Sequence, residues 1–505
     1  MSGPGSIPRR HMGLAALAAL AGAALALGPA AFLWGFSVDD ALITARYAAN
    51  IADGFGYRFN ASGPVTDGVT PLGFPYVLAP FAAGGPLAAL RAAKVLGIVA
   101  WVVAAGALGA AIARSSDKPA RFGALALIAA SAPLGAWSGA GMETGVALAL
   151  GGLAAALPEL GYGRAGALCA GACAALRPEM LPWAVVLGAA STFAPSKDAS
   201  RAASWREGAV RVAMAAAPFA LAALVRWSIF GRPAPLSILA KAPDVELGAK
   251  YALACFLLTG PVALVAPLAF PKLNAWPRGL LLATAAHFIA IALAGGDWMP
   301  LSRLAVPVLP AAALGAAHIA SVAPPLVTAA RLAVALAGEI FVFVRMGPVS
   351  ASVMESRLAV IDELRGSLQA PETRVVAALD IGWLGASTDA TIVDLAGVTD
   401  PAIAALPGGH TTKQIPLALI EARNVDTLVL LLAEDAPLKS PWTESRFARG
   451  VEQRIAFFPG IAEDFSPVAE SGLGEGNRKN LRYVVLKRVS SRTALFRDPA
   501  APSGR

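Results

Sequence analysis

The stretch Gly35–Pro75, GFSVDDALITARYAANIADGFGYRFNASGPVTDGVTPLGFP, decides how the rest of the chain is interpreted. It follows the first long apolar segment and begins with two adjacent acids, Asp39 and Asp40. A helix is predicted through Arg46 and Tyr47, followed by a loop rich in Gly, Asn and Pro. A polar passage of this kind beside an apolar segment predicts a functional loop at the edge of a membrane.

The composition is that of a membrane protein. Of the 505 residues, 56% are hydrophobic and 15% are charged, so a soluble fold would expose large apolar surfaces to water. The abundance of Ala and Gly suits close contact between helices in a bilayer. The net charge of +8 does not indicate nucleic-acid binding, because much of the Lys and Arg lies in short loops between apolar segments, where it sets orientation.

The three cysteines carry no chemistry that the sequence reveals. Cys169, Cys173 and Cys255 all lie inside apolar segments, which argues against a disulfide framework, and they show no metal-ligand spacing with His. We interpret them as small packing residues.

The first apolar segment, Leu14–Trp34, has the length of an uncleaved membrane span. Arg9 and Arg10 precede it and predict a cytoplasmic N-terminus, which puts Asp39 on the outer side. The next apolar piece, Leu72–Ala83, is too short to cross and contains prolines, so we expect a juxtamembrane or re-entrant helix.

Further apolar segments bring the expected count to about eleven spans, with the C-terminus outside. The polar triplet RPE separates two of them and is expected on the outer side, because fusing its neighbours would export the basic loop that follows. The segments after the first are Val95–Ala113, Phe122–Trp137, Ala165–Leu176, Met180–Phe193, Val212–Phe230, Tyr251–Phe270, Gly279–Ala294, Leu304–Ala320 and Leu332–Val344.

The composition changes after residue 346, where charged residues become frequent. We therefore divide the chain into a membrane module at 1–346, with its catalytic loop at 35–75, an extracytoplasmic α/β domain at 347–489, and a disordered tail at 490–505. A helix is expected at Ser352–Leu368, and strands are expected at Val375–Leu379, Thr391–Leu395, Thr427–Leu432 and Tyr483–Leu486.

This topology collects charged residues at one end of the bundle, where they could act on an anionic, lipid-linked substrate. Each also has a structural interpretation. Ser37 and Asp40 have the spacing of a helix capping box, so capping and chemistry stand as alternatives for Asp40. Asp39 lies outside the box, with Arg46 on nearly the same helix face. RPE is equally compatible with a helix hairpin closed by an ion pair, Asp297 with a cap, and Arg303 with a snorkelling side chain.

The first loop resembles the first outer loop of the type-C glycosyltransferase (GT-C) superfamily. The similar branch contains the terminal arabinofuranosyltransferases of mycobacterial cell walls and related bacterial proteins. The matching residues are Asp39, Asp40, Ala41, Arg46, Tyr47, Ala48, Asn50, Gly54, Gly56, Asn60, Gly68, Thr70, Pro71 and Leu72. Further matches follow in order: GMET at Gly141–Thr144, RPE at Arg177–Glu179, PLSILAK at Pro235–Lys241, GGDWMPLSRLAVPVLP at Gly295–Pro310 and DLAGVTDP at Asp394–Pro401. The sequence departs from the pattern at Ser237 and at Leu301-Ser302.

The resemblance implies a polytopic α-helical glycosyltransferase of the bacterial inner membrane that uses a polyprenyl-phosphate sugar at the outer face. Its acceptor would be a cell-envelope glycan or glycolipid, contacted by the α/β domain. It implies Asp39 as the general base, assisted by Asp40. We hypothesise a single in-line displacement, which would invert the anomeric configuration. The residues expected to bind the donor phosphate or the sugars are Arg46, Tyr47, Glu143, Arg177, Glu179, Lys241, Asp297 and Arg303. No cofactor is implied; the two adjacent acids could hold a divalent metal ion, but carboxylate pairs are too common to argue for one.

Two other classes of protein fit many of the same features. A transporter or flippase of a lipid-linked glycan would also place basic groups at an interface among Ala-rich and Gly-rich helices. Against it, the sequence contains no inverted repeat, and its polar groups gather at one end instead of near the midplane. A scaffold whose outer domain binds a partner stands as a third interpretation.

Overall fold

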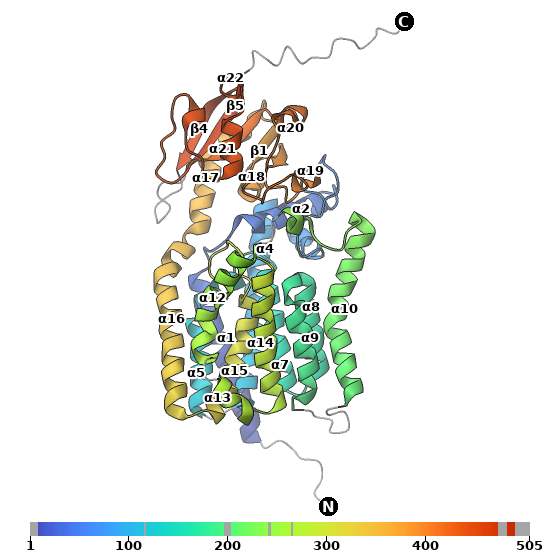
Figure 1. The fold of residues 1–505 in the computed structure, drawn as a ribbon, viewed down its shortest axis with the longest axis vertical. Helices are drawn as coiled ribbons and strands as arrows, with labels where there is room; N and C mark the ends of the chain where they lie inside the picture. The colour runs from blue at the N-terminus through green and yellow to red at the C-terminus, as the bar shows by residue number, and fades with distance from the viewer. Residues whose placement is uncertain are drawn as a thin grey trace, which may run out of the picture.

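A bundle of long helices carries a mixed β-sheet above one of its ends, opposite the N-terminus (Figure 1). The structure is a computed structural model, and it describes residues 9–115, 118–195, 204–240, 244–263, 266–472 and 482–489. The tail predicted at 490–505 and the candidate residue Lys241 lie outside these ranges.

Within the described residues, five helices are long and apolar enough to cross a membrane: Gly13–Phe32, Pro86–Ser115, Trp205–Phe230, Ala275–Leu293 and Pro325–Leu368. A mostly helical membrane module followed by a small α/β domain is thus confirmed, whereas the expected count of about eleven spans is not. The helices of the bundle are α1 (Arg9–Phe32), α4 (Pro86–Ser115), α5 (Lys118–Ala130), α6 (Ala132–Ser138), α7 (Thr144–Glu159), α8 (Gly163–Leu176), α9 (Leu181–Ala190), α10 (Trp205–Phe230), α12 (Val245–Ala263), α13 (Ala266–Ala269), α14 (Ala275–Leu293), α15 (Leu309–Val322) and α16 (Pro325–Ala351).

Small residues bring these helices close together. A Cβ atom added to Gly22 in α1 would lie 2.3 Å from the carbonyl oxygen of Ala105 in α4, and one added to Gly109 would lie 2.2 Å from that of Ala18. Only glycine fits such contacts, which is the packing that the composition predicts for helices in lipid. Large apolar side chains such as Leu224 and Phe341 instead lie on the outside, 67% and 65% exposed, where only lipid can cover them.

The apolar segment Phe122–Trp137, expected to be one span, is broken into α5 and α6. The break occurs at Ser131, whose hydroxyl accepts a hydrogen bond from the amide of Leu134 and so caps α6. Pro133 lies in the first turn of α6, where its missing N–H costs nothing. Hydrophobicity alone did not reveal this break.

Short helices gather at the end of the bundle below the sheet. The polar helix α2 (Asp39–Ala52) follows α1, and α3 (Phe74–Leu78) with the 3₁₀ turn η1 (Ala79–Phe81) forms the short apolar piece expected there. The helix α11 (Leu236–Ala240) is joined to the same loop, since the amide of Leu236 donates to the carbonyl of Asp67 at 3.1 Å. The loop 35–75 is therefore packed against the bundle, not free in solvent.

The C-terminal part is a five-stranded sheet with strand order β2-β1-β3-β5-β4. Strands β1, β2 and β3 are parallel, whereas β5 runs antiparallel to β3 and β4. The strands are β1 (Val375–Ala378), β2 (Thr391–Asp394), β3 (Thr427–Leu431), β4 (Phe465–Gly472) and β5 (Arg482–Arg488), and the helices are α17 (Val353–Leu368), α18 (Ile381–Ser387), α19 (Pro401–Ala404), α20 (Leu417–Ala422), α21 (Gly450–Ala456) and α22 (Ile461–Asp464).

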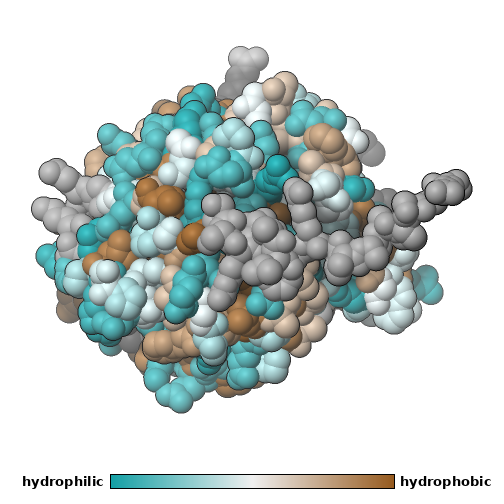
Figure 2. All heavy atoms as spheres, turned by 90° about the horizontal axis from the view of Figure 1, so that it is seen from above, coloured by the Kyte–Doolittle hydropathy of each residue, from teal (hydrophilic) through white to brown (hydrophobic). Residues whose placement is uncertain are grey.

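Four strands and α17 were expected close to these positions, but β4 was not. Its sequence, FSPVAESG, contains a proline and few apolar residues, which suits an edge strand and weakens the strand pattern. A register irregularity between Pro467 and Ala469 accommodates the proline. Seen from above, this end of the molecule shows hydrophilic and hydrophobic residues intermixed (Figure 2).

Candidate active site

A cavity of about 110 Å³ lies where the helical bundle meets the C-terminal domain. Its walls come from the start of α2, the loop residues 68–71, the segment before α7, and the turn that carries Arg303. The C-terminal domain supplies the opposite wall, with residues that follow β1 and β2. Segments far apart in sequence thus meet in one place at the end of the bundle.

Arg177 and its two acidic partners form one ion-pair cluster at this cavity. The guanidinium of Arg177 lies 2.9 Å from Glu143 and 2.6 Å from Glu179, and all three side chains are largely buried. Glu143 Oε1 takes the hydrogen bond, whereas its buried Oε2 has no hydrogen-bond partner among the described residues. The internal ion pair expected of the RPE triplet is present, and Arg177 also holds the cavity-lining acid Glu143; a binding role for the triplet stays a prediction.

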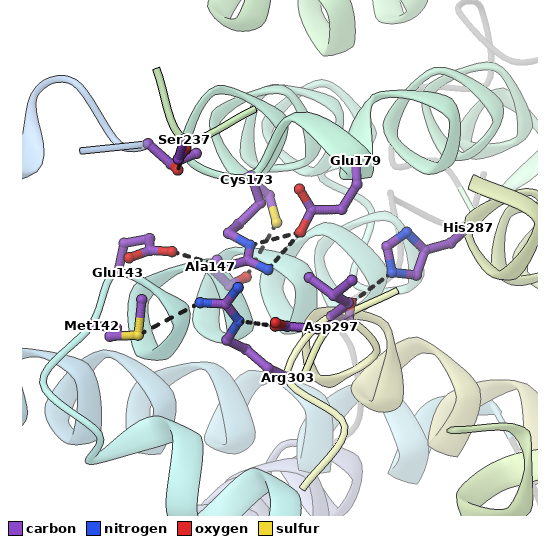
Figure 3. Close-up of polar contacts among 12 residues, drawn as sticks. Met142, Glu143, Ala147, Cys173, Glu179, Ser237, His287, Asp297 and Arg303 are labelled. Atoms are coloured by element: carbon purple, nitrogen blue, oxygen red, sulfur yellow. Dashed lines mark hydrogen bonds and ion pairs between the residues drawn. The ribbon is translucent and has the colours of Figure 1, made fainter. Parts of the chain in front are cut away.

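Arg303 forms a second cluster, beside the first (Figure 3). Its Nε lies 2.6 Å from Asp297 Oδ2, and its Nη1 lies 3.9 Å from Asp40 Oδ2 and 3.8 Å from the sulfur of Met142. The residues before it, Leu301 and Ser302, both have positive φ angles of 56° and 54°. Two successive left-handed residues are costly without glycine, and they turn the chain so that Arg303 reaches back to Asp297. The two residues at which the sequence departs from the GT-C pattern are therefore strained backbone positions in the site.

The two acids at the start of α2 have different surroundings. Both oxygens of Asp39 accept backbone hydrogen bonds from α18, at 2.9 Å from Gly382 and 2.7 Å from Trp383. Burial, followed by the nearby Asp380 carboxylate, raises the pKa of Asp39 to about 7, although the two N–H donors oppose the shift. Asp40 is the more open of the pair, with 39% of its side chain exposed.

The capping box suggested for Ser37 and Asp40 is wrong. Helix α2 begins at Asp39, its N-cap residue is Val38, and no side chain caps it. The hydroxyl of Ser37 instead donates to the carbonyl oxygen of Ala140 at 3.0 Å, which ties α2 to the bundle. The capping-box interpretation of Asp40 is therefore excluded.

Arg46 does not line the cavity. Its guanidinium donates to four carbonyl oxygens, those of Phe59 at 2.8 Å, Gly385 and Thr388 at 3.0 Å each, and Ala390 at 3.2 Å. Three of these belong to the C-terminal domain. A buried cation with its donors committed in this way holds two segments together and is not placed to bind a phosphate.

Tyr47 likewise organises the loop from outside the cavity. Its hydroxyl contacts the side-chain oxygen of Thr66 at 2.7 Å and the backbone of Thr66 and Gly68 at 3.0 and 3.3 Å. A Cβ atom on Gly68 would lie 2.7 Å from this hydroxyl and from the Thr399 methyl group. Glycine is needed at residue 68 because the loop and the C-terminal domain approach each other there.

The C-terminal domain contributes residues that we did not expect at the site. Asp380, Asp394 and His410 line the cavity. Asp394 shapes its own loop, because its oxygens accept hydrogen bonds from Ala396, Gly397 and Thr399. The position of an acid at or close to the C-terminal end of a β-strand was a usable signal for Asp380 and Asp394, whereas no sequence pattern indicated His410.

Acids outnumber cations around the cavity in the described part of the chain. The charged residues of its lining are Asp39, Asp40, Glu143, Asp380, Asp394, Arg177 and Arg303. Both arginines already have carboxylate partners, so hydroxyl-rich groups are better matched to this lining than a bare anion. No group of three or more His, Cys, Asp or Glu side chains with metal-site geometry occurs among the described residues.

Comparisons with known proteins give limited guidance. Residues 353–480 match a family described as a domain of unknown function, DUF8728, and no curated protein matches the sequence. The chain is similar to the Archaeoglobus fulgidus oligosaccharyltransferase in its apo form, with 14% identity and a TM-score of 0.46 over 94% of this chain and 74% of that one. For the same enzyme in complex with Zn and sulfate, the identity is 16% and the TM-score 0.41, over 82% and 67% of the two chains. At this level of similarity, function has to be argued from the site itself.

Proposed function

We propose that this protein is a membrane glycosyltransferase of the GT-C type, which transfers a sugar from a polyprenyl-phosphate donor to a glycan or glycolipid acceptor at the outer face of the inner membrane. The observation that carries the proposal is the meeting of Asp39, Asp40 and Arg303 in one cavity at the end of a membrane bundle. Acid–base catalysis beside a cation is what the transfer of a sugar away from a phosphate requires.

A second cavity supports a lipid-linked donor. It measures about 620 Å³ and is lined mainly by apolar residues, including Val65 and Leu72 of the loop and Leu221, Val225 and Phe230 of α10. Leu221 is 63% exposed and Val65 47% exposed, so the groove opens toward the region that lipid would fill. An apolar groove of this size suits an isoprenoid chain.

The loop segment 65–73 separates the groove from the active-site cavity. Val69, Thr70 and Pro71 line the cavity, whereas Leu72 and Gly73 line the groove. We infer that the donor lies across this segment, with its lipid in the groove and its sugar in the cavity. The phosphate of the donor, which joins the lipid to the sugar, would then lie against the segment 65–73.

Cations are available near this crossing. Arg58 lines the groove, and its Nε is buried without a hydrogen-bond partner among the described residues. Arg226 lies under the segment, but its donors are committed to Asp67 at 2.8 Å and to the carbonyl oxygens of Val69 and Thr70, so it holds the segment in place and is not itself a phosphate ligand. Lys241 follows α11, which contacts the same loop, so it stays a candidate phosphate ligand.

In the proposed reaction, Asp39 takes the proton of an acceptor hydroxyl, whose oxygen attacks the anomeric carbon of the donor. The bond from that carbon to the phosphate oxygen breaks, and polyprenyl phosphate leaves, so the anomeric configuration inverts. A pKa of about 7 suits a base that works near neutral pH. Each oxygen of Asp39 retains a lone pair for the acceptor beside its backbone hydrogen bond.

The test compares Asp39→Asn with Asp40→Asn and with Asp362→Asn, a matched change at an exposed acid of α17. Proteins in membranes or nanodiscs are assayed with a polyprenyl-phosphate sugar and a glycan acceptor. General-base catalysis contributes roughly 10²–10⁴ in rate, so Asp39→Asn should lose that factor in kcat and Asp40→Asn less. Asp362→Asn should match the wild type.

Asp39 also holds α18, so the thermal unfolding midpoint of each variant has to be measured alongside activity. A folded Asp39→Asn protein with near wild-type turnover would reject Asp39 as the base. Lipid movement between leaflets without sugar transfer would reject the enzyme in favour of a flippase.

A further inference from the structure

The helix α18 is capped by a residue of another domain. Its own N-cap residue, Asp380, makes no side-chain hydrogen bond to the helix. The amides of Gly382 and Trp383 donate instead to Asp39, which comes from the membrane module. The carboxylate of Asp380 is therefore free to turn elsewhere, while Asp39 is fixed against the C-terminal domain.

Asp380 is held by cations and a phenol of its own domain. Arg449 Nη2 donates to both of its oxygens, at 2.9 and 2.7 Å, and the hydroxyl of Tyr483 donates to one of them. Arg357 Nη1 in turn donates to the Tyr483 oxygen at 2.9 Å. These contacts come from α17, the N-cap residue of α21 and β5, and they hold Asp380 at the cavity wall.

We propose that Asp380 is a positioning residue for the reaction: it keeps a fixed negative charge beside Asp39, so that the C-terminal domain controls when Asp39 carries a proton. This inference rests on the proposed function for its catalytic meaning. It makes the C-terminal domain part of the catalytic machinery as well as a wall of the cavity.

Several other charged groups lie near Asp39, but Asp380 has the largest electrostatic effect on its pKa. Asp40 follows it in α2, and Arg303 Nη1 lies 3.9 Å from Asp40 Oδ2. Lys94 of α4 donates to the Phe36 carbonyl oxygen before α2, and Arg357 of α17 interacts electrostatically with Asp39. Burial and then Asp380 are the main causes of the raised pKa of Asp39.

The two acids are not equivalent. Burial alone would raise the pKa of Asp380 as well, but Arg449 and then Arg357 outweigh it and hold that pKa below its usual value. Asp380 therefore stays ionised while Asp39 takes up the proton. A proton taken from an acceptor hydroxyl would remain on Asp39 for the same reason.

The experiment reads the protonation of Asp39 directly. A hydrophobic carbodiimide labels protonated carboxyls, and mass spectrometry measures labelling of the Asp39 peptide in membranes between about pH 5 and 9. Labelling in the wild type should fall with a midpoint near pH 7. In Asp380→Asn the midpoint should move to lower pH by roughly one unit, because the like charge is gone.

Two controls separate charge from structure. Arg449→Lys keeps a cation beside Asp380 but changes its geometry, so the midpoint should stay at the wild-type value. Glu470→Gln removes an acid that pairs with Arg482 at the domain surface, at 2.6 Å, and should also leave the midpoint unchanged. An unmoved midpoint in Asp380→Asn, or an equal shift in either control, would overturn the proposal.

If Asp380→Asn does not fold, the double variant Asp380→Asn/Arg449→Gln removes both charges and leaves no lone buried ion. Its labelling midpoint should also lie below that of the wild type, since Asp380 lines the cavity and Arg449 does not. Labelling does not require turnover. If the labelling midpoint shifts but the acidic limb of the kcat/KM profile does not, Asp380 affects the protonation of Asp39, but Asp39 is not the catalytic base. If the midpoint does not shift, only the effect of Asp380 on Asp39 is rejected.

Discussion

At the scale of single residues, Arg46 shows how a charged residue in a motif serves structure. Its guanidinium lies 4.9 Å from the centre of the Phe59 ring, and its donors reach carbonyl oxygens on both sides of the domain boundary. Lysine has a compact ammonium with three donors and cannot reproduce this fork. The buried carbonyl oxygens would then lose partners, each at a cost of about 1–3 kcal/mol.

We therefore expect Arg46→Lys to destabilise the protein by on the order of 2 kcal/mol and to leave the KM for the lipid-linked donor unchanged. Thermal unfolding in detergent and donor titrations measure the two quantities. Arg58→Lys is the matched comparison, because Arg58 donates to a single carbonyl oxygen, that of Gly63, and lines the groove. A stable Arg46→Lys protein with a raised donor KM would restore the phosphate-binding role first expected for Arg46.

The sequence predicted which residues line the cavity better than it predicted the role of each residue. Asp39, Glu143, Arg177 and Arg303 line one cavity, as the shared polarity of their segments indicated. Arg46 could not be assigned from sequence because its partners are backbone carbonyls, three of them more than 300 residues away, and carbonyl groups leave no trace in a sequence pattern.

At the scale of elements, the loop 35–75 is largely a docking platform for the C-terminal domain. Asn60 donates to and accepts from the backbone of Ile392, and so pairs with the edge strand β2 as another strand would. Asp39 caps α18, and Gly68 allows close approach to Thr399. The motif residues that suggested a catalytic loop are thus explained mainly by the contact between the two domains.

The groove between this loop and α10 carries a prediction at the same scale. Ala222 lines the groove, whereas Leu224, two residues on, is 67% exposed and does not. A tryptophan at 222 would fill space that an isoprenoid chain needs. We expect Ala222→Trp to raise the donor KM by about tenfold, equivalent to about 1.4 kcal/mol.

Leu224→Trp is the control for the bulk of the new side chain in the membrane, and it should leave the donor KM at the wild-type value. Both variants should keep the kcat for the bound donor. An unchanged KM in Ala222→Trp, or equal effects in the two proteins, would place the lipid of the donor elsewhere.

At the scale of the whole molecule, the site exists only because two domains meet. Apolar segments and the change in composition indicated a membrane module and an α/β domain, but not the way in which they join. Part of the join is made by backbone contacts, such as the 2.9 Å hydrogen bond from the Met354 amide to the Gly35 carbonyl oxygen, and a Cβ at Gly35 would lie 1.7 Å from the Ala351 carbonyl oxygen. Hydrophobic periodicity cannot report such contacts, because they involve no side chain.

The orientation of the molecule in the membrane is the largest prediction still to be tested. Arg114 lies in the last turn of α4, and Lys272 and Arg278 lie on either side of the start of α14. The short helix α13, which precedes α14, lies at the end of the bundle opposite the sheet (Figure 1). Positive residues at span ends favour the cytoplasm. The sheet and the cavity should therefore face outward, where a lipid-linked sugar can be used.

Single cysteines test this directly, because Cys173 and Cys255 are buried and Cys169 is partly buried, so labelling of the parent protein sets a low background. Val468→Cys in β4 lies at a side chain that is 49% exposed, and Asn274→Cys lies at an exposed position before α14. A membrane-impermeant maleimide should label residue 468 in intact cells and residue 274 only after the membrane is opened. The reverse pattern would put the cavity in the cytoplasm, and labelling of both in intact cells would show that residues 274 and 468 are not separated by the bilayer.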